Sequence, residues 1–535
     1  MREFSALYRA LDGTTSTSDK RNALAGYFGS AAPADCAWAV YFLSGNRPPR
    51  PVSTRTLRTL AAMRARIPDW LFEESYQAVG DLAETIAHLL PPPGREPSDL
   101  PLQVWIEQRL LGLRGMAPEQ LEPALLGWWD ELDADQRFVW NKLLTGGFRV
   151  GVSRQLVVQA VAQASALPVQ TIAERLIGHW KPEPEAWLRL IDQQQQQTPT
   201  GRPYPFFLAN PLSAPVESLG ARDRWAAEWK WDGIRAQIIC RAGEVHVWTR
   251  GEELVTERFP EVVEILRALP AGCVLDGELV AWRDGRVAPF ALLQQRIGRR
   301  SLSAALLERA PVAFIAYDLL EQDGTDLRAQ PFSERRGRLE PLLESVAGDS
   351  LSISPLIEAD SWQALATQRL QARERGVEGL MVKRLDSAYG VGRTRSSPLG
   401  EWWKWKLDPL SVDAVLIYAQ RGHGRRASLY TDYTFALWQE NALVPFAKAY
   451  SGLTDAEIAE VDAFIRQHTV EKFGPVRSVT PRLVCEIGFE GIAASTRHKS
   501  GVAVRFPRIL RLRRDKPIEQ ADTLAHLRSL GSALR

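Results

Sequence analysis

The pattern of apolar residues changes near residue 200, and this change constrains the fold more than any other feature of the chain. Before about residue 190, apolar residues recur at helical spacing, as in Ile106, Leu110 and Leu113. From about residue 215, apolar and polar residues alternate instead, as in the stretch 234–240. Between the two parts, residues 193–197 are all glutamine, a composition typical of a flexible connector. The 535 residues therefore divide into several domains, the first of them helical.

The strand-rich part divides again near Asp408-Pro409. Before it, the alternating stretch 234–247 predicts one β-hairpin, and the stretch 274–287, with its Asp284-Gly285 turn, predicts a second. Helices are expected near 257–269 and 360–375, which gives an α+β domain. After it, short strands at 414–418, 433–438 and 483–489, with one helix near 454–468, favour a small β-barrel.

The composition of the chain limits the classes of protein to which it can belong. The net charge is only +2, so a nucleic-acid surface requires local clustering of basic residues. The four cysteines form no C-x-x-C pair, which argues against a cysteine-rich zinc site and fits a reducing cytoplasm. The first residues lack the apolar core of a signal peptide, and no stretch approaches the ~18 apolar residues of a membrane span. We therefore expect a cytoplasmic protein that does not engage a membrane.

The octapeptide at 228–235 reads Glu-Trp-Lys-Trp-Asp-Gly-Ile-Arg and is the strongest chemical signal. Lys230 lies between bulky aromatic residues, three positions before Gly233 and five before Arg235. A lysine is protonated at neutral pH and must lose its proton to attack phosphorus, and desolvation and nearby cations favour the neutral amine. The pattern predicts Lys230 as a nucleophile that forms a lysyl phosphoramidate. A surface lysine is the alternative interpretation.

Two glutamates lie within runs that otherwise resemble buried strands. They are Glu278, in the run 275–280, and Glu378, in the run 377–383. Buried carboxylates are costly unless they are paired or bind a metal, and next to a phosphate substrate they indicate magnesium. Structural salt bridges are the alternative interpretation.

Basic residues cluster at three further places. Lys404 and Lys406 alternate with tryptophans, so both ammonium groups share one strand face and suit a triphosphate, unless that face is simply solvated. The stretch 505–516 contains six cations and one acid and is suited to a polyanion such as pyrophosphate. Between Cys36 and Pro68 there are six arginines and no acid, at positions 47, 50, 55, 58, 64 and 66.

These pieces occur in an order that resembles the ATP-dependent DNA ligases, within the covalent nucleotidyltransferase superfamily. The resemblance covers almost the whole chain, and its order and spacing are specific although several fragments are individually weak. The matching segments are 230–235, 249–252 (one residue shorter than the common form), 276–278, 314–320, 378–383, 403–406 and 505–516. Residues 146–153 resemble the loop-and-helix segment of the ligase DNA-binding domain.

The resemblance implies roles at the nucleotide. Lys230 is the catalytic nucleophile, and Glu228 accepts a hydrogen bond from the adenine amino group. Tyr317 stacks on the base, with Phe314 as the alternative. The remaining ATP contacts fall on Arg235, Arg250, Glu278, Arg395, Lys404, Lys406, Arg508 and Lys516. Arg393 competes with Arg395 for its position, because residues 396–400 look like an insertion.

The resemblance also implies the partners. Glu278 and Glu378 hold Mg²⁺, for which Mn²⁺ can substitute, and ATP is the nucleotide substrate. A nicked DNA duplex is bound by shape and phosphate contacts rather than by base sequence. The DNA contacts expected in the helical part are Arg47, Arg50, Arg55, Arg58, Arg149 and Ser153. The architecture suggests a monomer, and no protein partner is indicated.

The expected fold is therefore multidomain. It comprises an all-α DNA-binding domain over residues 1–205, an α+β adenylation (nucleotidyltransferase, ATP-grasp-like) domain over 206–409 and an OB-fold β-barrel over 410–535. The expected function is ATP-dependent sealing of 5′-phosphate/3′-hydroxyl nicks through lysyl-AMP and DNA-adenylate, as used in DNA replication, repair and recombination. An RNA ligase or capping-type nucleotidyltransferase is the enzymatic alternative, and an inactive nucleic-acid clamp is the non-enzymatic one.

Overall fold

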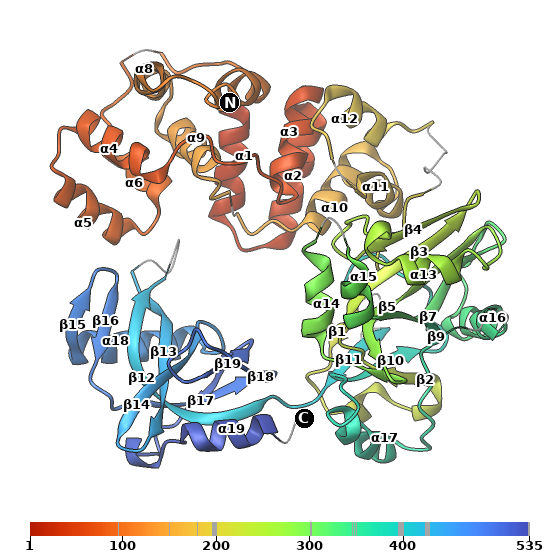
Figure 1. Cartoon of the computed structure of the whole chain (residues 1–535). Helices are drawn as coiled ribbons and strands as arrows, with labels where there is room; N and C mark the ends of the chain where they lie inside the picture. The colour runs from red at the N-terminus through yellow and green to blue at the C-terminus, as the bar shows by residue number, and fades with distance from the viewer. Residues whose placement is uncertain are drawn as a thin grey trace. The chain divides into compact units, whose positions relative to one another are not determined.

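The computed structural model describes residues 1–94, 96–148, 150–178, 180–194, 201–299, 302–344, 346, 348, 350–393, 401–422 and 428–532 (Figure 1). The chain forms two compact units. The first contains Met1–Lys20, Gly45–Val152 and Asp408–Arg535, and the second contains Arg21–Ser44 and Ser153–Leu407. These two units combine segments that are distant in the sequence, and they do not correspond one to one to the three predicted domains.

The helical part of the first unit is built around tryptophans. Trp105, Trp129 and Trp140 are fully buried, and the rings of Trp105 and Trp140 meet edge to face at 5.2 Å. Such aromatic contacts supply much of a helical core because each ring buries a large apolar area. The helices are α1 (Arg2–Gly13), α4 (Thr54–Ala65), α5 (Asp69–Val79), α6 (Leu82–Leu89), α7 (Leu102–Val104), η1 (Trp105–Leu110), α8 (Pro118–Asp130) and α9 (Ala134–Thr145).

Five of the described helices before residue 192 belong wholly or mainly to the second unit. They are α2 (Thr17–Ser30), which begins in the first unit, α3 (Pro33–Leu43), α10 (Arg154–Ser165), α11 (Val169–Leu176) and α12 (Pro184–Ile191). The Phe28 ring stacks on Trp187 at 5.3 Å, which joins α2 to α12. The Trp180 indole N–H donates to the Ala37 carbonyl at 3.0 Å, which ties the chain before α12 to α3.

The larger of the two sheets in the second unit has seven strands. Its order is β4-β3-β5-β7-β8, with β6 on β5 and β9 on β7. Both predicted hairpins are confirmed: β3 with β4, and β5 with β6 through a turn in which Asp284 and Gly285 have positive φ. The strands are β3 (Ile234–Arg241), β4 (Glu244–Thr249), β5 (Cys273–Arg283), β6 (Arg286–Val287), β7 (Val312–Gln322), β8 (Thr325–Asp326) and β9 (Leu351–Ile353).

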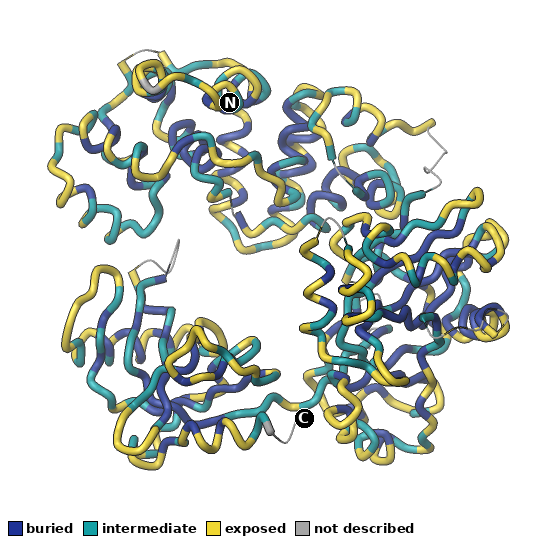
Figure 2. The backbone as a smooth tube through the Cα atoms, in the orientation of Figure 1, coloured by how far each residue is buried: buried dark blue, intermediate teal, exposed yellow. Residues whose placement is uncertain are grey.

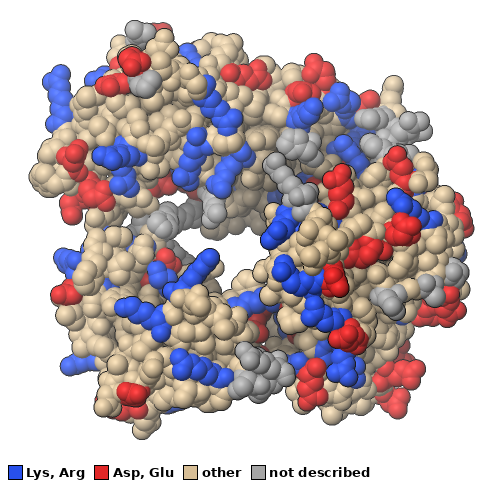
Figure 3. Space-filling view, viewed as in Figure 1, with Lys and Arg blue, Asp and Glu red and all other residues tan. Residues whose placement is uncertain are grey.

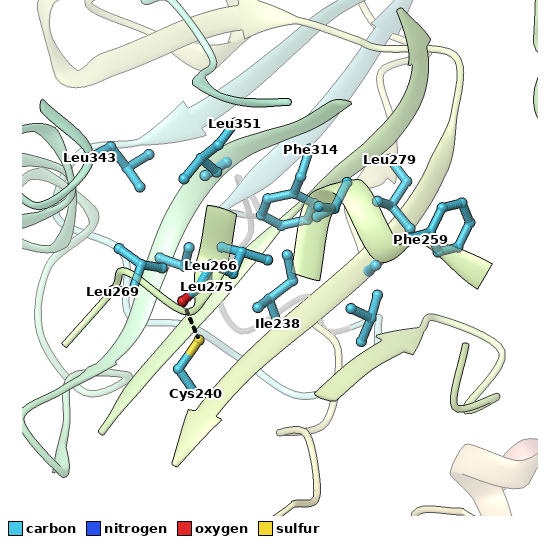
Figure 4. Close-up of a cluster of buried hydrophobic side chains, with 14 of the residues drawn as sticks. Ile238, Cys240, Phe259, Leu266, Leu269, Leu275, Leu279, Phe314, Leu343 and Leu351 are labelled. Atoms are coloured by element: carbon cyan, nitrogen blue, oxygen red, sulfur yellow. Dashed lines mark hydrogen bonds between the residues drawn. The ribbon is translucent and has the colours of Figure 1, made fainter. Parts of the chain in front are cut away.

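The alternation in β3 divides its residues between the two faces of this sheet. Ala236, Ile238 and Cys240 join a large apolar core, and Figure 4 shows Ile238 and Cys240 among leucines and phenylalanines from neighbouring elements. That core includes residues of α13 (Pro260–Leu266), α14 (Phe290–Ile297) and α16 (Phe332–Glu344), and α15 (Ala304–Arg309) follows α14 in the chain. Arg235 and Gln237 point to the opposite face, where the polar chemistry lies.

A second sheet has four strands in the order β1-β11-β10-β2. A separate core that includes Phe207, Ile239, Val274, Leu320 and Trp402 joins residues of both sheets. Figure 2 shows the strands of this unit as largely buried segments. The elements are β1 (Asn210–Pro211), η2 (Val216–Leu219), η3 (Arg222–Arg224), β2 (Trp225–Trp229), η4 (Thr256–Arg258), α17 (Trp362–Arg369), η5 (Leu370–Ala372), β10 (Gly379–Arg384) and β11 (Trp402–Lys406).

The C-terminal part of the first unit is a seven-stranded sheet with an added hairpin. The long strand β12 pairs with β13, β16 and β17, so it belongs to both halves of the sheet. The predicted strands and helix are confirmed at β12 (Leu410–Arg421), β13 (Tyr430–Gln439), β17 (Val484–Phe489) and α18 (Asp455–His468). The others are β14 (Ala442–Ala449), β15 (Thr469–Phe473), β16 (Val476–Val479), β18 (Gly491–Ala494), β19 (Val502–Arg505), β20 (Arg508–Leu512), η7 (Ile518–Gln520) and α19 (Leu524–Ser532).

Within the part of the chain that the structure describes, no helix combines the length and the apolar character needed to cross a bilayer.

Candidate active site

Lys230 follows β2 directly, and its backbone continues the ladder between β2 and β10. Its N–H donates to the Gly379 carbonyl at 2.9 Å, and its carbonyl accepts from the Glu378 N–H at 2.8 Å. Gly233 then lets the chain turn closely over β5, because a Cβ there would lie 2.2 Å from the Leu279 carbonyl oxygen. The glycine is therefore required by close packing against β5.

The Lys230 ammonium group pairs with the Glu378 carboxylate. Lys406 approaches the same carboxylate oxygen at 3.3 Å. Burial alone would raise the pKa of Glu378, but Lys230 and Lys406 outweigh it and lower the pKa. Glu378 is therefore an anion held between two lysines, and it orients the predicted nucleophile.

Glu278 lies on β5 directly across from Arg235 on β3. Burial raises its pKa to about 8, and the charges of Lys230 and Arg235 offset only part of that effect. The carboxylates of Asp276 and Glu378 raise it further. A carboxylate in this setting gains from an added cation, which fits the chemistry of a divalent-metal ligand.

The described residues contain no group of three or more His, Cys, Asp or Glu side chains that could hold a metal by themselves. Two carboxylates nonetheless suit Mg²⁺, which keeps several waters and is commonly bound by one or two carboxylates together with substrate phosphates. Glu278 and Glu378 therefore fit such a shared site.

Lys404 lies at the centre of a cluster of cations. Burial lowers its pKa, and the charges of Arg393, Lys230, Lys406 and Arg250 lower it further. Such repulsion is tolerated in a site that receives a polyanion. The predicted alternation in β11 is present, because Trp403 and Trp405 pack against a separate apolar core. Arg393 lies within this cluster, whereas Arg395 lies outside the described residues.

Glu228 is almost fully buried and pairs with the equally buried Lys383 at 3.1 Å. Burial raises the pKa of Glu228 and outweighs the opposing effects of Lys383 and Arg336. Its second oxygen, Oε1, lies 3.7 Å from Arg336 and has no hydrogen-bond partner among the described residues. A buried acceptor without a partner is unusual and suits a ligand donor.

The two candidates for the aromatic residue that is expected to stack on the base lie on opposite faces of β7. Phe314 belongs to the large apolar core, where its ring also closes over Gly277. Tyr317 faces the polar side, with the Lys383 ammonium 4.4 Å from its ring centroid. Of the two candidates, Tyr317 is therefore the one beside Lys383.

Arg235 lies in a buried network that the sequence did not reveal. Its guanidinium donates to both oxygens of Asp276, at 3.1 and 2.6 Å, and to the Phe207 carbonyl. The Tyr389 hydroxyl donates to Asp276 at 2.7 Å. The motif pointed to Asp276 but gave it no role, and Tyr389 had no recognisable signal. Asp276 and Tyr389 fix the side chain of Arg235.

The C-terminal cations lie in the other unit and are largely paired there. Asp413 accepts from both Arg513 and Lys516 at 2.7 Å. Arg508 lies 3.9 Å from Glu490, and Arg511 pairs with Glu486 at 2.6 Å. The basic stretch is thus balanced by acids from distant parts of the sequence, such as Asp413. Lys516 must leave Asp413 before it can contact another anion.

Some of the residues predicted to contact DNA lie close together in the first unit. A Cβ on Gly146 would lie 3.6 Å from the Arg47 side chain and 3.8 Å from Arg50, so the arginine strip borders the glycine loop. Arg55 is exposed, whereas Arg58 pairs with Glu73 at 3.1 Å. Figure 3 shows basic side chains on the visible face of the N-terminal helical region, with acidic ones among them.

Two other predicted contacts belong to the segment 146–153 in the sequence. Ser153 caps α10, where its side chain accepts from the Leu156 N–H at 3.2 Å. Arg149 lies outside the described residues.

Comparison with known proteins assigns this architecture to a family. Residues 206–406 match the family described as ATP dependent DNA ligase domain, residues 1–162 match DNA ligase N terminus, and residues 426–516 match ATP dependent DNA ligase C terminal region. The chain belongs to the ATP-dependent DNA ligases, enzymes whose family function is to seal nicks in DNA. The predicted helical region, nucleotidyltransferase region and C-terminal region are confirmed at this level.

Individual relatives agree with this assignment. The chain is 32% identical to a probable DNA ligase of Koribacter versatilis (strain Ellin345), over 96% of this chain and 94% of the relative. It is 28% identical to a DNA ligase of Thermococcus fumicolans, over 99% and 97%. A solved structure named Pmar-Lig_PreS3 shares the fold with a TM-score of 0.61 at 15% identity, covering 95% of this chain and 99% of the other.

Proposed function

We propose that Lys230 is the residue that carries AMP between ATP and nicked DNA. Its amine attacks the α-phosphorus of ATP, loses its proton and forms a P–N bond as pyrophosphate leaves. A 5′-phosphate oxygen at the nick then displaces the lysine and forms DNA-adenylate. The adjacent 3′-hydroxyl displaces AMP and closes the strand. The observation that carries this proposal is the Lys230–Glu378 ion pair at the edge of the cation cluster around Lys404.

The nucleotide roles follow from the surrounding groups. The adenine amino group donates to Glu228, whose free Oε1 supports this role, and Tyr317 stacks on the base. Arg235 and Arg250 contact ribose or phosphates. Lys404 and Lys406 hold the α-phosphate, with Arg393 or Arg395 beside them. In-line phosphoryl chemistry depends mainly on such positioning and charge neutralisation.

Glu278 and Glu378 would hold Mg²⁺ or Mn²⁺ together with the phosphates, and Glu278 also contacts ribose. The metal supplies charge neutralisation at the reacting phosphate when bound. The raised pKa of Glu278 supports this role, because a cation beside it would favour the ionised form.

The C-terminal part would act as an OB-fold β-barrel that supplies Arg508 and Lys516 to pyrophosphate. The support is the strand β12, which is shared by both halves of the sheet. Lys516 then exchanges Asp413 for pyrophosphate, and the domain swings about Asp408-Pro409 to admit DNA. Slower trypsin cleavage of this hinge in the presence of ATP would support the motion.

DNA binding is assigned to Arg47, Arg50, Arg55 and Arg58 of the arginine strip and to the neighbouring loop with Arg149 and Ser153. The enzyme would act as a monomer on a nicked duplex and in the cytoplasm. These assignments and the domain limits at 205 and 409 stay predictions.

The decisive experiment is incubation with α-labelled ATP and magnesium. Label should become bound to the wild-type chain and to a Lys472→Ala control, in which an exposed lysine of β15 is removed. It should be absent from the Lys230→Ala variant. Equal labelling of Lys230→Ala would defeat the assignment.

A second assay separates the enzymatic alternatives. A nicked DNA duplex should be sealed with ATP, whereas a nicked RNA duplex and GTP should be poor substrates. Preference for RNA would favour an RNA ligase, and use of GTP would favour a capping-type enzyme.

A further inference from the structure

A residue of the helical region, which lies outside the two sheets, contacts the loop that carries Arg250. The loop follows β4 and closes on itself: the Glu252 N–H donates to the Thr249 carbonyl at 2.9 Å, and the Thr249 N–H donates to the Glu253 carbonyl at 3.0 Å. The Arg250 N–H donates to the Arg235 carbonyl at 2.9 Å, which fixes the loop on β3. Arg250 therefore has a defined backbone position beside the cation cluster.

Glu252 occupies a backbone conformation that such a residue rarely adopts. Its φ is 61°, in the left-handed region where glycine or asparagine is usual. A non-glycine residue persists there when the surroundings hold it. We therefore expect contacts of the Glu252 side chain to offset the cost of this backbone conformation.

Two groups hold the side chain of Glu252. The Glu252 carboxylate pairs with Arg154, the first residue of α10, and accepts from the Gly178 N–H at 3.2 Å. Arg154 also donates to the Leu176 carbonyl, at the C-terminal end of α11. One guanidinium thus joins two helices to the Arg250 loop, and Figure 1 shows α10 and α11 beside the sheet that carries β3 and β4.

A second ion pair connects α11 to the strand-rich part of the same unit at a different place. Glu174 of α11 pairs at 2.8 Å with Arg328, which stacks on Tyr204 at 3.6 Å from the ring centroid. This pair does not touch the loop 249–253. It therefore provides a matched control that anchors the helices without holding Arg250.

We propose that Arg154 and Glu252 are positioning residues for the nucleotide step: the helical region holds the Arg250 loop in the orientation that receives ATP. This inference rests on the proposed role of Arg250 at the nucleotide. Arg154 immediately follows the predicted DNA-contact loop that ends at Ser153. Through this pair, a segment assigned to DNA binding also contributes to the reaction that precedes DNA binding.

The test is the ATP dependence of self-adenylylation in the full-length protein, followed by intact mass without DNA. Arg154→Met and Glu252→Gln should each raise the KM for ATP about fivefold, which corresponds to about 1 kcal/mol of lost binding. The rate at saturating ATP should change little, because Lys230, Glu378 and Lys404 are untouched. Glu174→Gln should leave KM unchanged. The charge-swapped double variant Arg154→Glu with Glu252→Arg should recover part of the loss.

The results that would contradict the inference can be told apart from those that would contradict the proposed function. An unchanged KM in Arg154→Met and Glu252→Gln would overturn the inference, and so would an equal rise in Glu174→Gln, which would indicate only general docking of the helices. A loss confined to the saturated rate would also overturn it. Failure of the wild-type chain to take up AMP would instead refute the proposed function. Thermal unfolding of each variant verifies that the unit remains folded.

Discussion

Lys230 and Glu378 are joined twice, by a side-chain ion pair and by a backbone hydrogen bond from the Glu378 N–H to the Lys230 carbonyl at 2.8 Å. The backbone bond holds the two main chains side by side, so that the side chains of Lys230 and Glu378 start close together. In the proposed site, this one carboxylate would both orient the amine and offer a ligand to a metal. This arrangement explains why two residues far apart in the sequence act as a single site.

Glu378→Gln should lower the rate of lysyl-adenylate formation about 100-fold or more. The loss of one preorganised charge in such a site typically costs about 3 kcal/mol of transition-state stabilisation. The measurement is single-turnover labelling with α-labelled ATP. Glu374→Gln, the same change at an exposed position four residues earlier, should retain wild-type activity. A Glu378→Gln rate within twofold of wild type would contradict the assigned role.

Lys383→Met should destabilise the second unit by about 3–5 kcal/mol, because it leaves the buried carboxylate of Glu228 without its ammonium partner. The double variant Lys383→Met with Glu228→Gln should lose less, since the uncompensated charge is gone. Denaturant unfolding of the single and double variants measures the coupling. If the two losses simply add, the pair contributes no specific interaction.

Glu278→Gln should stabilise the folded protein at alkaline pH. The pKa of Glu278 is raised to about 8 in the folded state from an ordinary value of 4.5, so between these values the folded state binds the proton more tightly than the unfolded chain. Stability attributable to this group therefore falls as pH rises through that window. Glutamine stays neutral and avoids the loss.

The expected gain is about 1–3 kcal/mol near pH 8.5 and close to zero near pH 4.5, because one pKa unit corresponds to about 1.4 kcal/mol. Thermal unfolding in a chelator, at the two pH values, measures it. Glu308→Gln, at an exposed position of the same unit, should show no such pH dependence. A gain that is equal at both pH values would reject the raised pKa as its cause.

The sequence predicts the local elements well, because they depend on neighbouring residues. The alternation of lysine and tryptophan at 403–406 identifies a strand with one apolar face, and β11 has that form. The Asp284-Gly285 turn likewise identifies the hairpin between β5 and β6. Both patterns follow from the period-two geometry of a strand and the positive φ of the turn.

The partners of charged residues could not be predicted in the same way. Lys516 appears as a free cation in a basic stretch, yet the fold brings Asp413 to it from another strand. Arg235 appears as an ATP contact, yet Asp276 engages its guanidinium at two atoms. Such pairs depend on strand order and register, which a single sequence does not encode locally.

Three arginines of the N-terminal strip should each contribute to the salt dependence of DNA binding. Arg47, Arg50 and Arg55 are exposed and form no ion pair among the described residues. Each phosphate contact that releases a counterion adds about 0.9 to the slope of log affinity against log salt. Substitution of each by glutamine should therefore reduce the slope by up to about that amount on a nicked duplex, measured in the Lys230→Ala background so that the nick persists.

Arg58 provides the contrast. Its guanidinium pairs with Glu73 at 3.1 Å and lies 4.4 Å from the Tyr76 ring centroid, so it is already committed within the protein. Arg58→Gln should change the slope by less than half as much and should instead lower the stability of the first unit. If all four substitutions leave the slope unchanged, the strip does not contact the DNA backbone. If Arg58→Gln changes it as much as the other three, Arg58 exchanges Glu73 for a phosphate when DNA binds.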